Sequence, residues 1–191
     1  KNDLKNSVYI LTLCIFLTTG TASAVNLDSL WGVWNDKNQA DTNRLKAMHN
    51  IARDGYLFSQ PDSAFYFAKL QYDFAESVNN KKQMAAALNT QGVSFYFKGA
   101  YKKSIDCYTR SLITQEEIGN KKGIANSLNN IGVIYDEQGD YAKAIDYYTR
   151  SLTIRQEIGD KRGIAGSLSN IGLIYSGQGD FAKAIDYYTR S

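Results

Sequence analysis

Residues 125–151 read ANSLNNIGVIYDEQGDYAKAIDYYTRS, and residues 165–191 read AGSLSNIGLIYSGQGDFAKAIDYYTRS. At an offset of 40 residues the two segments differ at only six of their 27 positions. Self-similarity at a fixed period of about 20–50 residues is the signature of a repeat protein. The chain therefore contains a tandem repeat, and this repeat decides the fold.

The same offset extends the repeat toward the N-terminus. Residues 85–124 form a clear earlier copy, and an eroded copy begins near residue 45, where NNKK at 79–82 corresponds to GNKK at 119–122. We therefore assign residues 45–191 to a repeat array, with copies at 45–84, 85–124, 125–164 and the truncated 165–191.

Within one copy the apolar residues recur with helical spacing. A helix that begins after Asp140 is indicated by the i, i+3, i+4, i+7 pattern of Tyr141, Ala144, Ile145 and Tyr148. This helix is expected to continue to Gly159. The preceding segment, 124–137, carries a second apolar helical face.

A glycine followed by a helix-capping residue separates these helices. Gly139-Asp140 lies between the two helices of one copy, and Gly119-Asn120 and Gly159-Asp160 lie between copies. Glycine suits the left-handed position that ends a helix, and an Asp or Asn side chain accepts hydrogen bonds from the first N–H groups of the next. Each copy is therefore predicted to be a helix–turn–helix hairpin.

These residues resemble the tetratricopeptide repeat family. The family's pattern of large, small and aromatic positions is met by Leu128, Ile131, Gly132, Tyr135, Ala144, Tyr148 and Ser151, then by Leu168, Ile171, Gly172, Tyr175, Ala184, Tyr188 and Ser191, and earlier by Leu88, Gln91, Gly92, Phe95, Ser104, Tyr108 and Ser111. The resemblance is specific from residue 85 onward and weak before it. It implies an all-α fold, a right-handed α-solenoid of antiparallel helix–turn–helix hairpins.

The period of 40 departs from the family's usual period of about 34. A period of 40 alone also suits a HEAT or armadillo array, but the twelve-residue step from Gly132 to Ala144 is that of the tetratricopeptide pattern. The additional residues follow Ser151, where the second helix continues. This arrangement resembles the long-helix variety found in kinesin light chains and in many bacterial signalling proteins.

The glycine of the repeat is expected at the contact between the two helices of a hairpin. Gly132 should be buried where they approach most closely, opposite Ala144. Alanine at position 132 should gain helix propensity, whereas leucine should destabilise the protein by overpacking.

The resemblance also implies where a ligand would bind, because in this family the first helix of each hairpin lines the concave groove. The implied peptide-binding positions are Asn89, Val93, Tyr96, Asn126, Asn129, Asn130, Val133, Asp136, Ser169, Asn170 and Leu173. Asn130 and Asn170 are expected to hydrogen-bond a peptide backbone, or alternatively to stabilise local structure only. The family's carboxylate clamp is disfavoured, because its basic positions hold Ala86, Asn126 and Gly166.

The first 24 residues read as a secretory signal peptide. Lys1 and Lys5 precede the apolar stretch VYILTLCIFL, and residues 22–24 form a small-residue cleavage pattern. The alternative is an uncleaved N-terminal anchor. We expect export across the bacterial inner membrane, with any further membrane tether lying beyond the fragment. Residues 25–44 form a lead-in segment whose Trp31 and Trp34 are expected to pack against the first hairpin.

Composition and single residues point away from catalysis. One proline in 191 residues favours long uninterrupted helices, and a net charge of +3 argues against nucleic-acid binding. His49, the only histidine, has no ligand-type neighbours at suitable spacing, and Cys107 occupies the repeat position of Tyr147. No acid–base pair, triad or metal cluster emerges, so we expect no enzyme activity, no cofactor and no metal.

Two functional hypotheses remain. In the first, the chain is a non-catalytic module that binds a peptide or protein in the concave groove. In the second, it is the exported sensory part of a longer bacterial signalling enzyme, a histidine kinase or a nucleotide cyclase. The chain begins with Lys1 and stops at Ser191 within a predicted helix, so we expect it to be an N-terminal piece of a longer protein.

Overall fold

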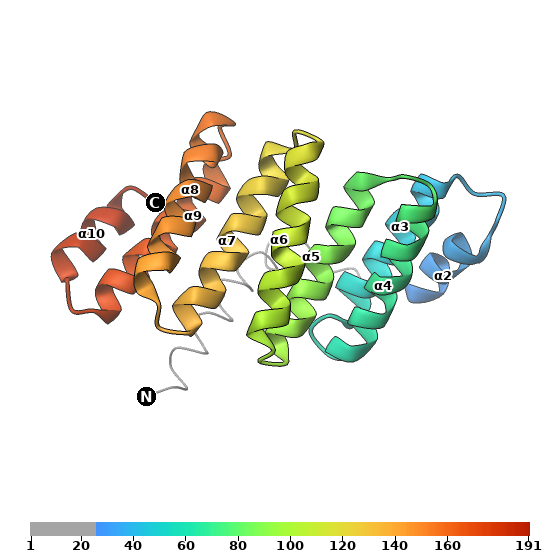
Figure 1. The fold of residues 1–191 in the computed structure, drawn as a ribbon, viewed down its shortest axis with the longest axis horizontal. Coiled ribbons are helices and arrows are strands. Elements are labelled where there is room, and N and C mark those ends of the chain that lie inside the picture. The colour runs from blue at the N-terminus through green and yellow to red at the C-terminus, as the bar shows by residue number, and fades with distance from the viewer. Residues whose placement is uncertain (1–25) are drawn as a thin grey trace.

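The computed structural model describes residues 26–191. The predicted signal peptide, residues 1–24, lies outside these described residues. Helical pairs stand side by side from α2 to α10, and each pair is packed against the next along the chain (Figure 1).

The described residues form helices joined by short turns. The elements are α2 (Leu27–Asn35), α3 (Asp41–Asn50), the π-helical segment η2 (Ile51–Tyr56), α4 (Pro61–Ser77), α5 (Lys81–Phe97), α6 (Tyr101–Glu117), α7 (Lys121–Glu137), α8 (Tyr141–Glu157), α9 (Lys161–Gly177) and α10 (Phe181–Thr189).

The helix lengths explain the period of 40. Helices α5 to α8 each have 17 residues and are separated by three-residue turns. The hairpins α5/α6, α7/α8 and α9/α10 follow the predicted helix–turn–helix pattern, and α3 with η2 takes the place of the first helix before α4. Structural units therefore begin at residues 41, 81, 121 and 161, four residues ahead of the copies assigned from sequence.

The predicted helix ends are confirmed. Gly139 has a φ of 76° after α7, and the Asp140 side chain accepts a hydrogen bond from the Lys143 N–H at the start of α8. A side-chain β-carbon disfavours positive φ, which is why glycine is preferred at this position. In the eroded first copy Asn79 takes the same conformation with a φ of 52°, because asparagine tolerates it better than most residues.

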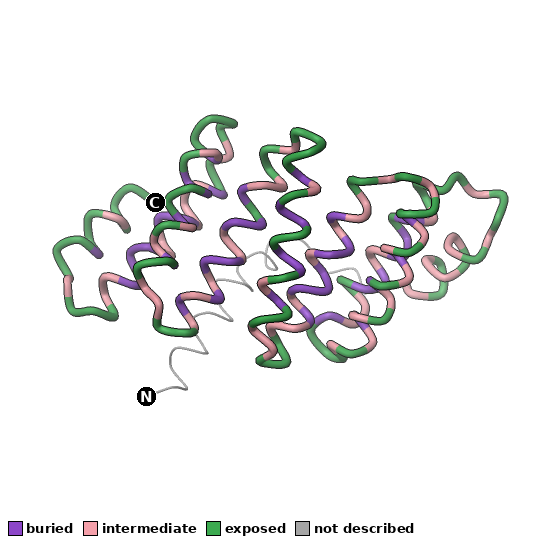
Figure 2. Tube along the Cα trace, in the orientation of Figure 1, coloured by how far each residue is buried: buried purple, intermediate pink, exposed green. Residues whose placement is uncertain are grey.

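Two buried clusters each join the second helix of one hairpin to the first helix of the next. One buried cluster joins Tyr108 and Leu112 of α6 to Leu128, Ile131 and Ile134 of α7. A second cluster joins α8 to α9 and is built from Ala144, Tyr148, Leu152, Leu168, Ile171 and Ile174. Figure 2 shows the buried stretches on the stacked helices and the exposed residues of α10.

The glycine contact differs in one respect from the expectation. Gly132 is buried, as predicted, but a β-carbon there would lie 2.8 Å from the Tyr148 ring and 3.4 Å from the Ala144 carbonyl oxygen. The helix contact is therefore filled by an aromatic ring, and even alanine meets a steric cost that the sequence pattern did not indicate.

The lead-in segment packs as predicted. Trp31 and Trp34 both lie in α2. Trp31 makes an edge-to-face contact with Phe67 of α4, and Trp34 makes one with Phe74 of α4, with ring centroids 5.2 and 5.4 Å apart. The guanidinium of Arg44 lies over both the Trp34 and the Phe74 rings. This aromatic layer covers the N-terminal side of the first hairpin.

Candidate functional site

The first helices of successive hairpins are joined by a row of asparagine side chains. Asn130 Nδ2 of α7 donates to Asn89 Oδ1 of α5 at 2.9 Å, and Asn170 Nδ2 of α9 donates to Asn129 Oδ1 of α7 at 3.3 Å. Both pairs are separated by 41 residues in sequence. We call these two pairs the amide ladder, and the side of α5, α7 and α9 that carries it the ladder face.

The amide ladder uses only part of the hydrogen-bonding capacity of its residues. An asparagine side chain has two N–H donors and an oxygen with two lone pairs. Within each pair one donor and one lone pair are consumed, and all four asparagines are only half-buried. The ladder therefore holds four amides in fixed orientation and leaves polar groups for a ligand.

A third pair follows the same offset of 41 residues. The Tyr96 hydroxyl of α5 donates to Glu137 Oε1 of α7 at 3.1 Å. Burial, together with the charge of Glu137, raises the pKa of Tyr96 well above its usual range. The hydroxyl is therefore protonated at neutral pH and the Glu137 carboxylate is its acceptor.

A buried arginine reaches the ladder face from the second helix of a hairpin. Arg155 of α8 is 8% exposed and donates through Nη1 to the Gly163 carbonyl at 2.8 Å and through Nη2 to Asn126 Oδ1 at 3.2 Å. Burial lowers the pKa of Arg155, and the charge of Asp160 opposes this shift. The space is available because Gly163 has no side chain there.

The remaining predicted site residues lie on the same helices with different exposure. Val93, Val133, Ser169 and Leu173 are half-buried, and Asn126 is exposed. Asp136 is only 7% exposed, so little of its carboxylate reaches the surface. The amide ladder pairs Asn130 with Asn89 and Asn170 with Asn129. Tyr96 is joined to Glu137 by a separate hydrogen bond between the same helices, α5 and α7.

Two residues considered for chemistry have structural surroundings. Cys107 is 4% exposed, and burial raises the pKa of its thiol to about 11, so it is a neutral thiol near pH 7. The His49 pKa is lowered, first by burial and then by the nearby Arg53. Within residues 26–191 no group of three or more His, Cys, Asp or Glu residues is placed to hold a metal ion.

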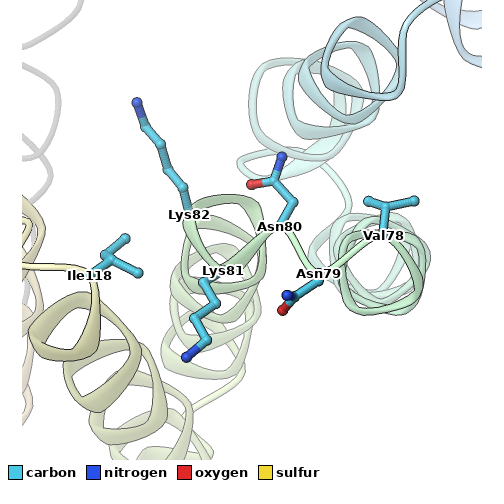
Figure 3. A pocket seen from close by; sticks show the side chains of 6 residues that line it. All are labelled: Val78, Asn79, Asn80, Lys81, Lys82 and Ile118. Carbon is cyan, nitrogen blue, oxygen red and sulfur yellow. The ribbon is translucent and has the colours of Figure 1, made fainter.

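A shallow pocket of about 410 Å³ lies at the turn between α4 and α5. It is lined by Val78, Asn79, Asn80, Lys81, Lys82 and Ile118 (Figure 3). Lys81 and Lys82 extend in opposite directions from the start of α5, and Lys81 forms a salt bridge with Glu117. The pocket is open and lies at a turn, away from the hydrogen-bonded side chains of α5, α7 and α9, so the ladder face remains the candidate site. Among the described helices, none is long and apolar enough to cross a membrane.

Sequence reasoning did not single out two residues near the ladder face. Arg155 replaces Gln115 of the previous copy, and this change from amide to cation at a repeat position was the available signal. Phe58 lies in the eroded first copy, where no repeat pattern marks its position; it contacts Phe97 of α5 with ring centroids 5.7 Å apart.

Comparison with known proteins identifies the family. The family model described as "Tetratricopeptide repeat" matches residues 83–157 and 137–191, which together make up more than half of the chain. The chain belongs to the tetratricopeptide repeat family, and the predicted all-α, right-handed solenoid of hairpins is confirmed. No curated protein sequence matches the chain.

Several solved structures share the fold at low sequence identity. BtubC from P. vanneervenii is 20% identical with a TM-score of 0.70, and the match covers 85% of this chain and 67% of that one. A Rap protein complexed with competence and sporulation factor is 16% identical with a TM-score of 0.73, covering 79% and 42%. A signal transduction ATPase from Pyrococcus horikoshii with a tetratricopeptide repeat sensor is 19% identical with a TM-score of 0.71, covering 84% and 25%.

The fold and the family together indicate, in general terms, a protein-interaction module. Tetratricopeptide repeats are generally non-catalytic scaffolds that bind proteins or peptides.

Proposed function

We propose that this chain binds an extended peptide segment of a partner protein along the ladder face of α5, α7 and α9, without catalysis of its own. The amide ladder is the observation that carries the proposal. An extended peptide presents N–H and C=O groups that need partners, and amide side chains can both donate to them and accept from them.

The pairing of the asparagines supports this role. Each ladder bond fixes the orientation of two side chains, so that a ligand does not have to order them on binding. The alternative, that the asparagines stabilise local structure only, gives a different prediction: removing them would then lower stability without changing ligand binding. The Rap protein that shares this fold is complexed with competence and sporulation factor, which supports ligand binding by proteins of this fold.

Selection from a peptide library tests the proposal. The chain is immobilised and used to select from a random 12-residue phage-displayed library, and the enriched peptides are synthesised for affinity measurement. Asn130→Ala and Asn170→Ala should each weaken binding by about five- to tenfold, as expected for lost hydrogen bonds. Gln156→Ala, an exposed residue of α8, is the matched control and should leave affinity unchanged. Enriched peptides that bind both asparagine variants as tightly as the parent would exclude the ladder as the site.

A second candidate is the sensory region of a longer bacterial signalling enzyme, a histidine kinase or a nucleotide cyclase. It is favoured by the Pyrococcus horikoshii ATPase, in which the region similar to this chain is a quarter of a longer protein that carries a repeat sensor. Reading the open reading frame past Ser191 tests it. A stop codon within one or two repeats, with no apolar segment of about 20 residues, would eliminate this candidate.

We also propose export across the bacterial inner membrane, on the basis of the signal-peptide pattern of residues 1–24. Fusion of residues 1–44 to a reporter that is active only outside the cytoplasm should give activity. The same fusion with Ile10 and Leu13 replaced by Arg should not, because charges interrupt the apolar region. Equal activity from both fusions would refute export.

A further inference from the structure

The C-terminal end of α5 is aromatic, whereas the C-terminal end of α7 is acidic. The repeat positions that hold Tyr96 and Phe97 in α5 hold Asp136 and Glu137 in α7. Because the ladder face pairs residues 41 apart, the aromatic end of α5 lies directly beside the acidic end of α7. The hydrogen bond from the Tyr96 hydroxyl to Glu137 Oε1 marks this junction.

A residue outside the well-formed repeats adds to the aromatic side. Phe58 meets Phe97 edge to face, and Phe97 and Tyr101 each lie within about 6 Å of Tyr96, with ring centroids 5.6 and 6.1 Å apart. Phe58 is 55% exposed and Phe97 is 38% exposed. Exposed aromatic side chains that gather in one place are typical of interaction surfaces rather than of folding.

The half-buried Glu137 carboxylate beside these rings accepts from a neutral hydroxyl, as the Glu76 carboxylate does from the Tyr72 hydroxyl. Glu117 and Glu157 form salt bridges with Lys81 and Lys121 across the two helices of their own hairpins, whereas Glu137 accepts a hydrogen bond from the neutral Tyr96 hydroxyl of the preceding hairpin. Tyr96 does not neutralise the charge of Glu137. The nearby Lys98 is paired with Asp62. The aromatic rings therefore border a negative charge.

Aromatic faces next to a carboxylate are complementary to a cationic side chain. A guanidinium stacks on aromatic rings and makes two parallel hydrogen bonds to a carboxylate, which an ammonium group cannot do. The array itself contains such contacts: Arg150 lies over the Tyr147 ring and Arg190 over the Tyr187 ring. We propose that the corner formed by Phe58, Tyr96, Phe97 and Glu137, the arginine corner, binds an arginine side chain of the partner peptide. This inference rests on the proposed function and specifies the chemistry of the partner at one end of the ladder face.

A direct titration tests the corner without any peptide. The full chain, labelled for NMR, is titrated with N-acetyl-arginine amide and, separately, with N-acetyl-citrulline amide, which has the same shape but no charge. Arginine amide should shift the signals of Phe97, Tyr96 and Glu137, and citrulline amide should not. In Glu137→Gln the arginine response should be lost, whereas Glu157→Gln, an exposed glutamate of α8, should respond like the parent. No shift at the corner with arginine amide would overturn the proposal.

The peptide selection separates this inference from the proposed function. Enriched peptides should contain arginine, and replacing it with citrulline should weaken binding to the parent by about tenfold but have little effect in Glu137→Gln. Peptides that need the asparagines but lose nothing on citrulline replacement would refute the arginine corner and leave the proposed function standing. An arginine response at the corner together with a failed peptide selection would refute the proposed function instead.

Discussion

The ring of Tyr148 occupies the space into which a β-carbon of Gly132 would extend, with Cδ1 and Cε1 both 2.8 Å from that position. Tyr148 is fully buried in the cluster between α8 and α9, so its ring cannot move aside without disturbing that core. The same relation holds between Gly92 and Tyr108, where the distance to the ring is 2.6 Å. A glycine on the first helix and a tyrosine on the second are therefore one packing unit.

Gly132→Ala is expected to destabilise the protein, although alanine favours a helix by nearly 1 kcal/mol over glycine. Displacing a buried ring by overpacking typically costs about 1–3 kcal/mol, so the steric term exceeds the gain in propensity. We expect a net loss of about 1 kcal/mol for Gly132→Ala and a larger loss for Gly132→Leu. Urea denaturation followed by circular dichroism measures both.

Two other glycines serve as controls for this prediction. Gly177 lies in α9 with nothing within 4 Å of its missing β-carbon, so Gly177→Ala should be neutral or slightly stabilising. Gly172 faces Tyr188, which is 38% exposed and can move, so Gly172→Ala should cost less than Gly132→Ala. A Gly132→Leu variant as stable as the parent would contradict the assigned packing.

The fold could be predicted because the same helix and turn signals recur in each copy of the repeat. A period of 40, apolar positions at helical spacing and Gly-Asp turns all indicate the same hairpin, and the helix ends at Gly139 and Asp140 agree with it. What the period could not give was its phase, since any starting residue fits a periodic sequence. The caps at Asn80, Asn120 and Asp160 supply the phase through side-chain hydrogen bonds at the helix starts.

The site was less accessible to sequence reasoning. The ladder positions follow from the family's groove positions. The bond between Asn130 and Asn89, however, joins residues 41 apart, one more than the repeat period of 40, and this offset between neighbouring hairpins is not visible in the sequence. Arg155 and Phe58 depart from the repeat, and a departure alone does not say which neighbour a side chain reaches. Their contacts with Asn126 and Phe97 required the three-dimensional structure.

The buried Arg155 should depend on the charge of Asp160. Asp160 caps α9 and offsets the cost of burying the guanidinium, whereas the corresponding residues of the previous copy, Gln115 and Asn120, form a neutral hydrogen bond of 2.7 Å. We expect Asp160→Asn to cost about 1–2 kcal/mol in the parent and much less in an Arg155→Gln background. A double-mutant cycle measured by urea denaturation gives this coupling.

Asp140→Asn provides the comparison for that cycle. Asp140 also caps a helix, but its carboxylate pairs with the exposed Lys143 rather than serving a buried cation. Asparagine retains the capping acceptor in both variants. Equal losses for Asp160→Asn and Asp140→Asn, with no coupling to Arg155, would show that Asp160 acts only as a cap.

The salt bridge between Lys121 and Glu157 should contribute little to stability. It repeats the Lys81–Glu117 pair one hairpin later, with both side chains more than half exposed at 59% and 51%. Exposed pairs of this kind contribute about 0–1 kcal/mol because solvent and salt screen the charges. Glu157→Gln should lower the urea midpoint only slightly, and that difference should vanish in 1 M salt. A loss above about 2 kcal/mol would mean that the pair holds the two helices of its hairpin together.

The segment 176–191, which contains the last helix, should exchange its amide protons faster than residues 125–150 of the preceding copy. Phe181 and Ile185 of α10 are 65% and 62% exposed. The equivalent residues of the preceding copy, Tyr141 and Ile145, pack against the buried cluster that joins α8 to α9. In a repeat array each hairpin is stabilised by its neighbours. Hydrogen exchange read by mass spectrometry should therefore show faster uptake in 176–191 than in 125–150. Equal protection of the two segments would contradict this expectation.

The stability of the protein should fall as the pH is lowered from about 7.5 to 5.5, because of one residue. His49 is the only histidine, and its pKa is lowered from 6.5, first by burial and then by the positive charge of Arg53. The unfolded chain therefore takes up a proton near pH 6.5, where the folded protein does not, and unfolding becomes more favourable with each step down in pH. This dependence should level off below the pKa of the folded state, since both states are then protonated. Carboxyl groups titrate near pH 4 and do not account for a change in this range. Urea midpoints measured at pH 7.5, 6.5 and 5.5 should decrease in the parent and stay constant in His49→Gln.

A parent midpoint that is constant over this range would contradict this prediction. An NMR titration that places the His49 pKa at or above 6.5 would do the same, because it would show that the surroundings of the ring do not hold it neutral.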